Sequence, residues 1–238
     1  MIKWLKTFID IILPPRCLLC GKVIHSDNTL CGECFSKINF ISKPYCKHCG
    51  LPLIDNTQNE LGCMSCLSDK NHFRLCRSTI KYDNFSKKII LDFKFSDRLE
   101  NKKLLSRWLF IAGEDIFKQG IDVIIPVPLH YARLFKRKYN QSAVLAEGLS
   151  KLCNIPADFS SLKKIKHTTP QILCSGKQRT QNVKNAFQVV APEHLKGKRI
   201  VLIDDVYTTG STLNECAKAL KKAGAKSVDA LTIARVCS

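Results

Sequence analysis

Acidic residues, aromatic residues and long hydrophobic runs are scarce in this chain of 238 residues. The 20 Asp and Glu residues are outnumbered by 38 Lys and Arg residues, and the net charge of +18 favours polyanionic ligands. Aromatic residues make up only 8% of the chain, which leaves few platforms for stacking nucleic-acid bases. The absence of Gly-x-x-x-x-Gly-Lys-Ser/Thr, and of Gly-x-Gly-x-x-Gly after a strand, argues against the common nucleotide-binding loops.

The stretch from Met1 to Leu13 is apolar and mildly basic, but it is too short and too charged to span a membrane. It has no small-residue cleavage site and therefore no export signal. Its nearly helical spacing of apolar residues predicts a short helix packed on the protein, with a membrane-surface anchor as the alternative. We therefore expect a cytoplasmic protein without a transmembrane segment.

The length and the 45% apolar content allow one sizeable core beside a small module. We expect the boundary in the polar stretch around Ser68 to Arg74, which divides the chain into residues 1–70 and 75–238. The charge is unevenly shared, because residues 1–75 carry nine basic and six acidic residues (+3), whereas residues 76–238 carry 29 and 14 (+15). A polyanionic partner and a merely lysine-rich composition both explain this excess.

Eight of the 13 cysteines form four Cys-x-x-Cys pairs in the first third of the chain. A two-residue gap lets both sulfur atoms of a turn reach one ion, and two such pairs complete a tetrahedral zinc site. Such closed sites are structural, since they leave no coordination position for a reaction. The predicted zinc ligands are Cys17, Cys20, Cys31, Cys34, Cys46, Cys49, Cys63 and Cys66.

Two other uses of these cysteines are less favoured. A disulfide framework requires an oxidising compartment, and a redox Cys-x-x-Cys usually occurs once, beside a βαβ pattern. The spacing favours a sequential arrangement, in which neighbouring pairs share an ion, but it leaves a crossed arrangement open. In either arrangement the sequence predicts two zinc ions.

The segment from Val201 to Thr212 contains a hydrophobic run, two acids and a hydroxyl-rich loop, in that order. Val201 to Ile203 predict a buried parallel strand, and helical spacing resumes at Leu213. The backbone N–H groups and the dipole at the start of such a helix favour a bound phosphate. Asp204 and Asp205 suit a vicinal diol or a metal ion that bridges diol and phosphate. The predicted phosphate-binding residues are Thr208, Thr209, Gly210, Ser211 and Thr212.

A second anion-binding segment is predicted where another buried strand ends. The expected strands cover residues 78–82, 122–127, 200–204 and 227–233, and the expected helices cover 85–95, 101–117 and about 141–152. Alternation of the later strands with helices predicts a mainly parallel sheet, which binds ligands at the carboxyl ends of its strands. The strand at 122–127 leads into a proline-fixed loop with arginines that suit pyrophosphate oxygens. These residues are Pro128, Leu129, His130, Arg133 and Arg137.

The segment 201–212 closely resembles the 5-phosphoribosyl-1-pyrophosphate (PRPP) motif of type I phosphoribosyltransferases. The resemblance implies that Asp204 and Asp205 hold the ribose 2′- and 3′-hydroxyls and that Thr208 to Thr212 hold the 5′-phosphate. It also implies an α/β fold, with a mainly parallel sheet and flanking helices, preceded here by the small zinc-ribbon domain.

The order of motifs along nearly the whole chain resembles the ComF-type competence phosphoribosyltransferases. The matching segments are the zinc ribbons, Lys94 to Asp97, Pro126 to His130, Asn140-Gln141, Thr168-x-x-Gln171, Arg179, Asn182-Val183, Phe187 and the PRPP loop. The resemblance implies a bacterial cytoplasmic protein of natural transformation. It also implies PRPP, single-stranded DNA and competence-apparatus proteins as partners, with peripheral contact with the inner membrane.

Two features bear on catalysis. Lys138 stands where the family pattern usually has a glycine, and this change constrains the backbone beside the pyrophosphate. Residues 160–185 are basic with little apolar periodicity, which predicts a mobile loop that closes over a polyanion. We expect Arg179, or alternatively Lys177, to reach the departing pyrophosphate and to serve catalysis with Asp204 and Asp205. We also expect Mg²⁺ to arrive with PRPP.

Three functions are consistent with these features. The first is PRPP binding in DNA uptake, with or without transfer of phosphoribose, because the residues specify no acceptor. The second is a single-stranded DNA-binding or adaptor protein that uses the fold as a scaffold. The third is a nucleobase-salvage phosphoribosyltransferase, against which the lack of a base-recognition signature counts.

Overall fold

The computed structural model describes residues 13–54, 62–68, 71–95, 101–166 and 181–237. The expected N-terminal helix at residues 1–13 lies outside this part of the chain, except for Leu13. Within the described ranges, no helix is long and apolar enough to cross a membrane.

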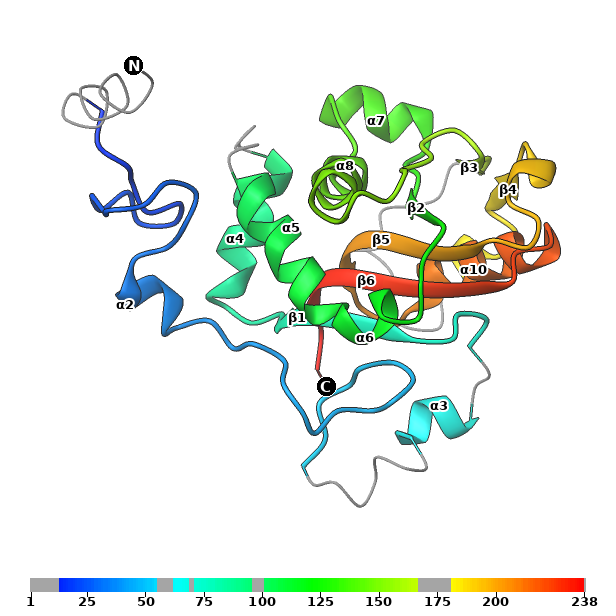
Figure 1. Cartoon of the computed structure of the whole chain (residues 1–238), viewed down its shortest axis with the longest axis horizontal. Coiled ribbons are helices and arrows are strands. Elements are labelled where there is room, and N and C mark those ends of the chain that lie inside the picture. The colour runs from blue at the N-terminus through cyan, green and yellow to red at the C-terminus, as the bar shows by residue number, and fades with distance from the viewer. Residues whose placement is uncertain (1–12, 55–61, 69–70, 96–100, 167–180, 238) are drawn as a thin grey trace.

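A four-stranded sheet forms the centre of the molecule (Figure 1). Its strands are β1 (Cys76–Lys81), β2 (Val123–Pro126), β5 (Arg199–Tyr207) and β6 (Ser227–Arg235). The strands lie in the order β1-β6-β5-β2, and every neighbouring pair is parallel. All four strands had been expected close to these bounds, and the parallel α/β fold is confirmed.

Both faces of the sheet are buried, as the nearly continuous apolar runs of parallel strands require. Val201 and Ile203 join one core with helices α4 (Ser86–Phe95), α5 (Asn101–Ala112) and α8 (Gln141–Cys153). Ile200 and Leu202 face the other core, which contains helix α10 (Ser211–Lys222). Side chains that alternate along one strand therefore fill two separate cores.

Shorter elements connect and extend this framework. They are α2 (Gly32–Phe35), α3 (Met64–Ser68), α6 (Glu114–Phe117), α7 (Tyr131–Arg137), the 3-10 helix η2 (Pro192–His194) and the antiparallel strands β3 (Leu162–Lys164) and β4 (Phe187–Val189). The pair β3 and β4 lies beside α10.

Three expectations about these elements were wrong in detail. The helix expected over 101–117 is interrupted at Gly113, where a Cβ atom would collide with Leu231 and Phe117. Strand β5 continues beyond residue 204 to Tyr207, because β6 pairs with it over this length. The segment 160–185 begins with strand β3 instead of a loop, since Lys163 and Lys164 pair with β4.

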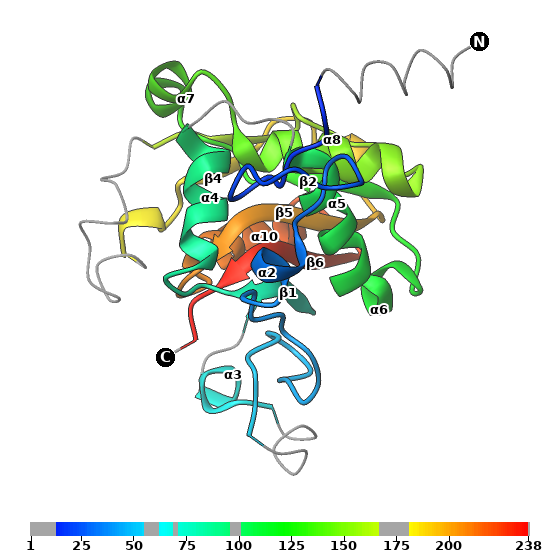
Figure 2. The same ribbon diagram turned by 90° about the vertical axis from the view of Figure 1, so that its left-hand side faces the viewer.

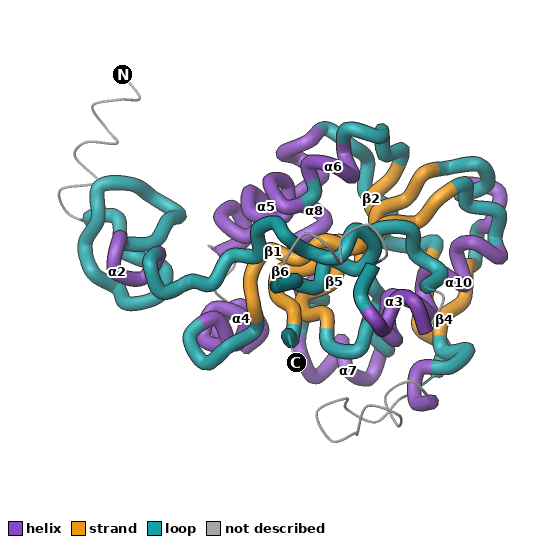
Figure 3. Tube along the Cα trace, turned by 90° about the horizontal axis from the view of Figure 1, so that it is seen from below, coloured by secondary structure: helices purple, strands orange, loops and turns teal. Residues whose placement is uncertain are grey.

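The two cysteine-rich ribbons occupy different sides of the sheet (Figures 1 and 2). The first lies beside α4 and α5, and the Phe40 ring that follows it packs edge-on against Trp108 at 5.1 Å. The second lies beneath the sheet with α3, as the view from below shows (Figure 3). The division of the chain at residues 70–75 stays a prediction, because the ribbons pack into both hydrophobic cores.

Between the ribbons, the chain adds a short antiparallel segment to the edge of the sheet. Phe40 pairs with Ile80, the Lys81 N–H donates to the Asn39 carbonyl at 2.8 Å, and the Ile41 N–H donates to the Thr79 carbonyl at 2.9 Å. Beyond the ribbons, the Arg74 guanidinium pairs at 2.6 Å with the buried Asp229 carboxylate of β6. These contacts attach the N-terminal part of the chain to the sheet on both sides of the second ribbon.

Candidate functional site

The eight predicted zinc ligands form two separate four-cysteine clusters. The first cluster contains Cys17, Cys20, Cys31 and Cys34, and the second contains Cys46, Cys49, Cys63 and Cys66. The sulfur atoms of each cluster all lie within 4.8 Å of one another. The sequential arrangement is therefore confirmed, and the crossed arrangement is wrong.

The geometry of both clusters fits a tetrahedral metal ion. Zinc–sulfur bonds of about 2.3 Å place neighbouring sulfur atoms about 3.8 Å apart. The sulfur atoms of Cys20 and Cys31 are 3.7 Å apart, and those of Cys49 and Cys63 are 3.5 Å apart. A hydrogen bond from the Cys49 thiol lowers the pKa of Cys46 to about 3, and the same contact raises the pKa of Cys49. The clusters are consistent with two structural zinc sites.

The backbone supports the two clusters in the same way. The N–H of Cys31 donates to the Cys17 sulfur at 3.3 Å, and the N–H of Cys63 donates to the Cys46 sulfur at the same distance. A sulfur atom that accepts such a bond is stabilised as a thiolate. Each ribbon therefore presents two cysteine turns to one point.

Away from the clusters, the acidic pair lies in the last part of β5. Asp204 and Asp205 are half-buried. One carboxylate oxygen of Asp204 accepts hydrogen bonds from the Ser142 hydroxyl at 3.0 Å and from the Asp205 N–H at 2.9 Å. The start of α8 thus fixes the orientation of the Asp204 carboxylate.

The hydroxyl-rich loop follows directly and is short. It contains Thr208, Thr209 and Gly210, and α10 begins at Ser211. The Thr209 and Ser211 hydroxyls are 2.8 Å apart, and the Ser211 N–H donates to the Thr209 hydroxyl at 3.4 Å. The turn therefore collects hydroxyl groups at the amino end of a twelve-residue helix, the place where an anion is favoured.

The proline-rich loop after β2 lies beside the acidic pair. The Val127 N–H donates to the Ile203 carbonyl at 2.9 Å, and the Asn140 side chain donates to the Val127 carbonyl at 3.0 Å. Pro128 and Leu129 follow, and the buried His130 caps α7 by accepting from the Ala132 N–H. Residues 127–130 and Asp204 therefore meet at the carboxyl ends of the neighbouring strands β2 and β5.

The structure describes only some of the other predicted site residues. Arg133 and Arg137 belong to α7, which continues from the proline-rich loop. Arg179, its alternative Lys177 and the Thr168-x-x-Gln171 segment lie outside the described residues. The structure thus brings together the acidic pair, the hydroxyl-rich loop and the proline-rich loop.

Sequence reasoning assigned no role to two residues beside this site. Ser142 orients Asp204, and the only sequence signal was its position directly after Asn140-Gln141. Tyr207 is buried under the hydroxyl-rich loop, where a Cβ atom on Gly210 would collide with its ring and hydroxyl. Burial raises the pKa of this hydroxyl, which therefore stays protonated at neutral pH. Tyr207 lies inside the motif but does not point toward the solvent.

Lys138, at the end of α7, adopts a positive φ of 66°. This region favours glycine, and a residue with a Cβ atom is strained there. Lys138, which replaces the glycine of the family pattern, therefore occupies a backbone conformation that favours glycine.

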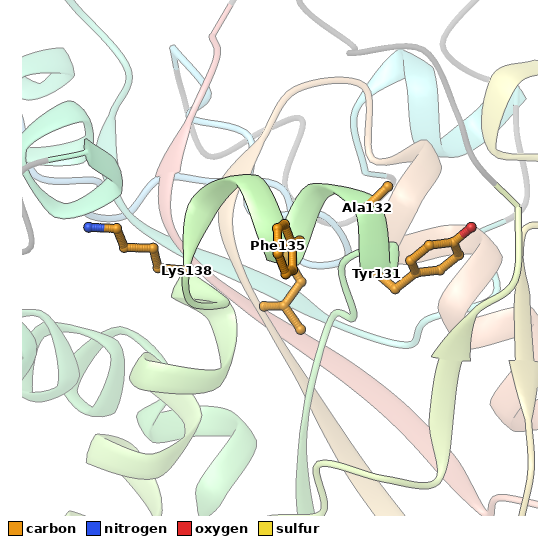
Figure 4. Close-up of a pocket in the computed structure, with 5 residues that line it drawn as sticks. Tyr131, Ala132, Phe135 and Lys138 are labelled. Atoms are coloured by element: carbon orange, nitrogen blue, oxygen red, sulfur yellow. The ribbon is translucent and has the colours of Figure 1, made fainter.

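Helix α7 also exposes an apolar surface (Figure 4). Phe135 is 92% exposed and Tyr131 is 77% exposed, four residues apart on one helical face. With Ala132, Leu134 and Lys138 they line a groove of about 760 Å³. Figure 4 shows the Lys138 side chain extending from the end of the helix opposite Tyr131.

Two protein families match this chain, one at its cysteine-rich ribbons and one over most of the α/β part that follows. The double zinc ribbon domain family matches residues 8–67, and the phosphoribosyl transferase domain family matches residues 112–237. Competence protein F of Haemophilus influenzae is 36% identical over 226 residues, which cover 92% of this chain and 96% of that protein. DNA utilization protein YhgH of Escherichia coli K12 is 31% identical over 228 residues, which cover 94% and 98%.

A Bacillus subtilis protein, competence protein ComFC, is 27% identical over 239 residues, which cover 92% of this chain and 94% of that protein. Among solved structures, glutamine PRPP amidotransferase from B. subtilis, complexed with ADP and GMP, matches with a TM-score of 0.40 and 21% identity. That match covers 65% of this chain and 34% of the amidotransferase chain, so this protein spans about a third of its length.

Purified protein should contain about two zinc ions per chain, because eight thiolates in two clusters complete two closed tetrahedral sites. Elemental analysis of protein prepared under reducing conditions measures this ratio. Cys153→Ser, which alters a cysteine outside both clusters, should keep two ions. A ratio near zero would contradict both sites, and a ratio of one would contradict one of them.

Replacing Lys138 with glycine should raise the free energy of unfolding by about 1 kcal/mol, because relief of backbone strain exceeds the added entropy of the unfolded chain. Urea denaturation measures the change. Asn154→Gly is the matched control, since Asn154 also ends a helix at positive φ but asparagine tolerates this conformation. Asn154→Gly should lower the free energy of unfolding. An equal decrease in Lys138→Gly would contradict the strain argument.

Proposed function

Because this chain belongs to the ComF and YhgH family of competence proteins, in which a double zinc ribbon precedes a phosphoribosyltransferase domain, we propose that it binds PRPP during DNA uptake. The observation that carries the proposal is the meeting of three segments at one sheet edge. The acidic pair, the hydroxyl-rich loop and the proline-rich loop offer partners for a diol, a phosphate and a pyrophosphate within one site.

Each segment has a distinct role in this proposal. Asp204 and Asp205 accept hydrogen bonds from the ribose 2′- and 3′-hydroxyls, and Thr208 to Thr212 bind the 5′-phosphate. The Ser142 hydroxyl occupies one oxygen of Asp204 and thereby limits the directions from which the ribose can approach. Pro128 to His130, with Arg133 and Arg137 of α7, form the pyrophosphate side.

Transfer of phosphoribose is the second level of the proposal. Arg179, or Lys177, neutralises the pyrophosphate as it departs from C1. Carboxylate and phosphate oxygens are the donors that Mg²⁺ prefers, and the Asp204 and Asp205 carboxylates fit this donor set. When bound with PRPP, the ion supplies charge that stabilises the leaving pyrophosphate. The strained backbone at Lys138 should impair this transfer step more than it impairs ligand binding.

A second candidate function, single-stranded DNA binding, is favoured by the surface of α7. Tyr131 and Phe135 are exposed aromatic rings on one helical face, and such rings stack on unpaired bases. The helix and the next residue carry Arg133, Lys136, Arg137 and Lys138, and no acidic residue occurs between Asp122 and Glu147. Cationic and aromatic residues close together in the sequence are the combination that single-strand binding favours. Both rings are more exposed than the other exposed rings of the described residues, which are Phe35, Phe40, Phe110 and Phe159.

Replacing both acids, as Asp204→Ala with Asp205→Ala, should weaken PRPP binding at least about a hundredfold, because two or more charged hydrogen bonds are worth about 1.5–3 kcal/mol each. Isothermal titration with PRPP, with and without Mg²⁺, measures the loss. Asp122→Asn is the control, since Asp122 pairs with Arg199 at the opposite ends of the same two strands. Near wild-type affinity in the double variant, with zinc content and circular dichroism retained, would show that this assignment of the acidic pair is wrong.

Removing the two rings, as Tyr131→Ala with Phe135→Ala, should weaken binding of a thymidine oligonucleotide by at least about tenfold, because stacking contributes about 1–3 kcal/mol per base. Fluorescence anisotropy at constant salt measures the affinity. Both rings are exposed, so the fold should not change. Phe159→Ala removes an exposed ring elsewhere and should leave the affinity unchanged. Equal affinity in all three proteins would exclude α7 as the DNA surface.

A further inference from the structure

Arg235, at the end of β6, contacts the second cysteine cluster and the strand before the hydroxyl-rich loop. Its side chain is buried. One guanidinium nitrogen donates to the Cys49 carbonyl at 2.7 Å, and another lies 3.5 Å from the Cys49 sulfur. The guanidinium carbon also lies 3.9 Å from the centre of the Tyr207 ring. One side chain thus connects a predicted zinc ligand with Tyr207.

Tyr207 in turn supports the backbone of the hydroxyl-rich loop. Tyr207 is 6% exposed, and its ring contacts both the Arg235 guanidinium and Phe73, whose ring centre is 6.5 Å away in an edge-on arrangement. Gly210 lies against the ring so closely that any Cβ atom would collide, and it has a φ of 75°. The position of the ring therefore determines how the loop turns into α10.

A second set of hydrogen bonds runs from the same cluster to the same loop. The Asn71 side chain donates to the Cys66 sulfur at 3.4 Å, and the His72 N–H donates to the Asn214 side chain in α10 at 2.6 Å. The Asn214 N–H donates to the Gly210 carbonyl at 2.9 Å. The first cluster packs instead in the core that contains α4 and α5.

A bound metal ion would strengthen the contact with Arg235. Four thiolates around one divalent ion carry a net charge of about −2, which attracts a buried guanidinium. The contact between Arg235 and the Cys49 sulfur should therefore be stronger in the zinc-loaded protein than in the metal-free protein. Its Nε atom has no hydrogen-bond partner within the described part of the chain, so its remaining contacts matter more.

We propose that Arg235 is a positioning residue through which the second cysteine cluster holds the hydroxyl-rich loop in its phosphate-binding shape. The first cluster has no such role. This inference rests on the proposed binding of phosphate by residues 208–212. It assigns the two zinc sites different tasks, since one stabilises the attachment of the first ribbon and the other also prepares the ligand site.

The test compares two buried arginines in the full-length protein. Arg77 also contacts the second ribbon, through the Lys47 carbonyl at 3.0 Å and the Tyr45 ring at 4.9 Å, but its other partners are Asp115 and the Cys76 carbonyl. Arg235→Met should accelerate amide hydrogen exchange in residues 208–214 and weaken PRPP binding, each by about tenfold. Arg77→Met should leave both within about twofold of wild type. Unchanged exchange in a folded Arg235→Met, or equal acceleration in both variants, would overturn the proposal.

A matched pair of cysteines decides the question if Arg235→Met does not fold. Cys31 and Cys63 are both buried, and each donates its N–H to the first cysteine of its own cluster. Cys63→Ser should accelerate exchange in residues 208–214, whereas Cys31→Ser should not, with zinc content measured in both. The opposite pattern, or no difference, would overturn the proposal. A wild-type protein that did not bind PRPP would refute the proposed function, while the exchange measurements would still decide this coupling.

Discussion

The parallel pairing of β5 with β6 is the interaction on which the remaining structure depends. It extends from Arg199 opposite Ser227 to Tyr207 opposite Arg235, and both strands lie in the middle of the sheet. Its first part builds the two hydrophobic cores, and its last part carries the acidic pair. Because the pairing continues to Tyr207, the same ladder that stabilises the fold also brings Arg235 to the base of the hydroxyl-rich loop.

The two cysteine clusters stabilise the amino-terminal part of the chain. Residues 13–54 and 62–68, the part of the ribbons that the structure describes, contain too little regular structure to bury a core of their own, and metal–thiolate bonds can replace that missing burial. The buried cysteines are also part of the two cores of the sheet. The ribbons are therefore local in sequence but depend on the sheet for their place, and the second one contributes contacts to the site in return.

Local sequence patterns gave a good account of the elements and of the metal ligands. The alternation of strands with helices predicted that the strands now seen as β2, β5 and β6 lie in a mainly parallel sheet. The helix expected over 101–117 failed at Gly113, where the neighbouring Leu231 comes from a distant strand. The end of β5 was misplaced because acidic residues resemble a strand boundary, while pairing with β6 extends the strand beyond them.

The candidate site also combines features that the sequence predicted with contacts that only the fold creates. Cysteine spacing, the order of acids and hydroxyls and the proline-rich loop lie within short segments, so their chemistry could be inferred from the residues alone. Two contacts join distant segments: Ser142 with Asp204, 62 residues apart, and Arg235 with Cys49, 186 residues apart. No periodicity or spacing encodes such pairs. They arise only when the strands align and the helices pack, because burial of the common cores sets the distance between segments that share no local pattern.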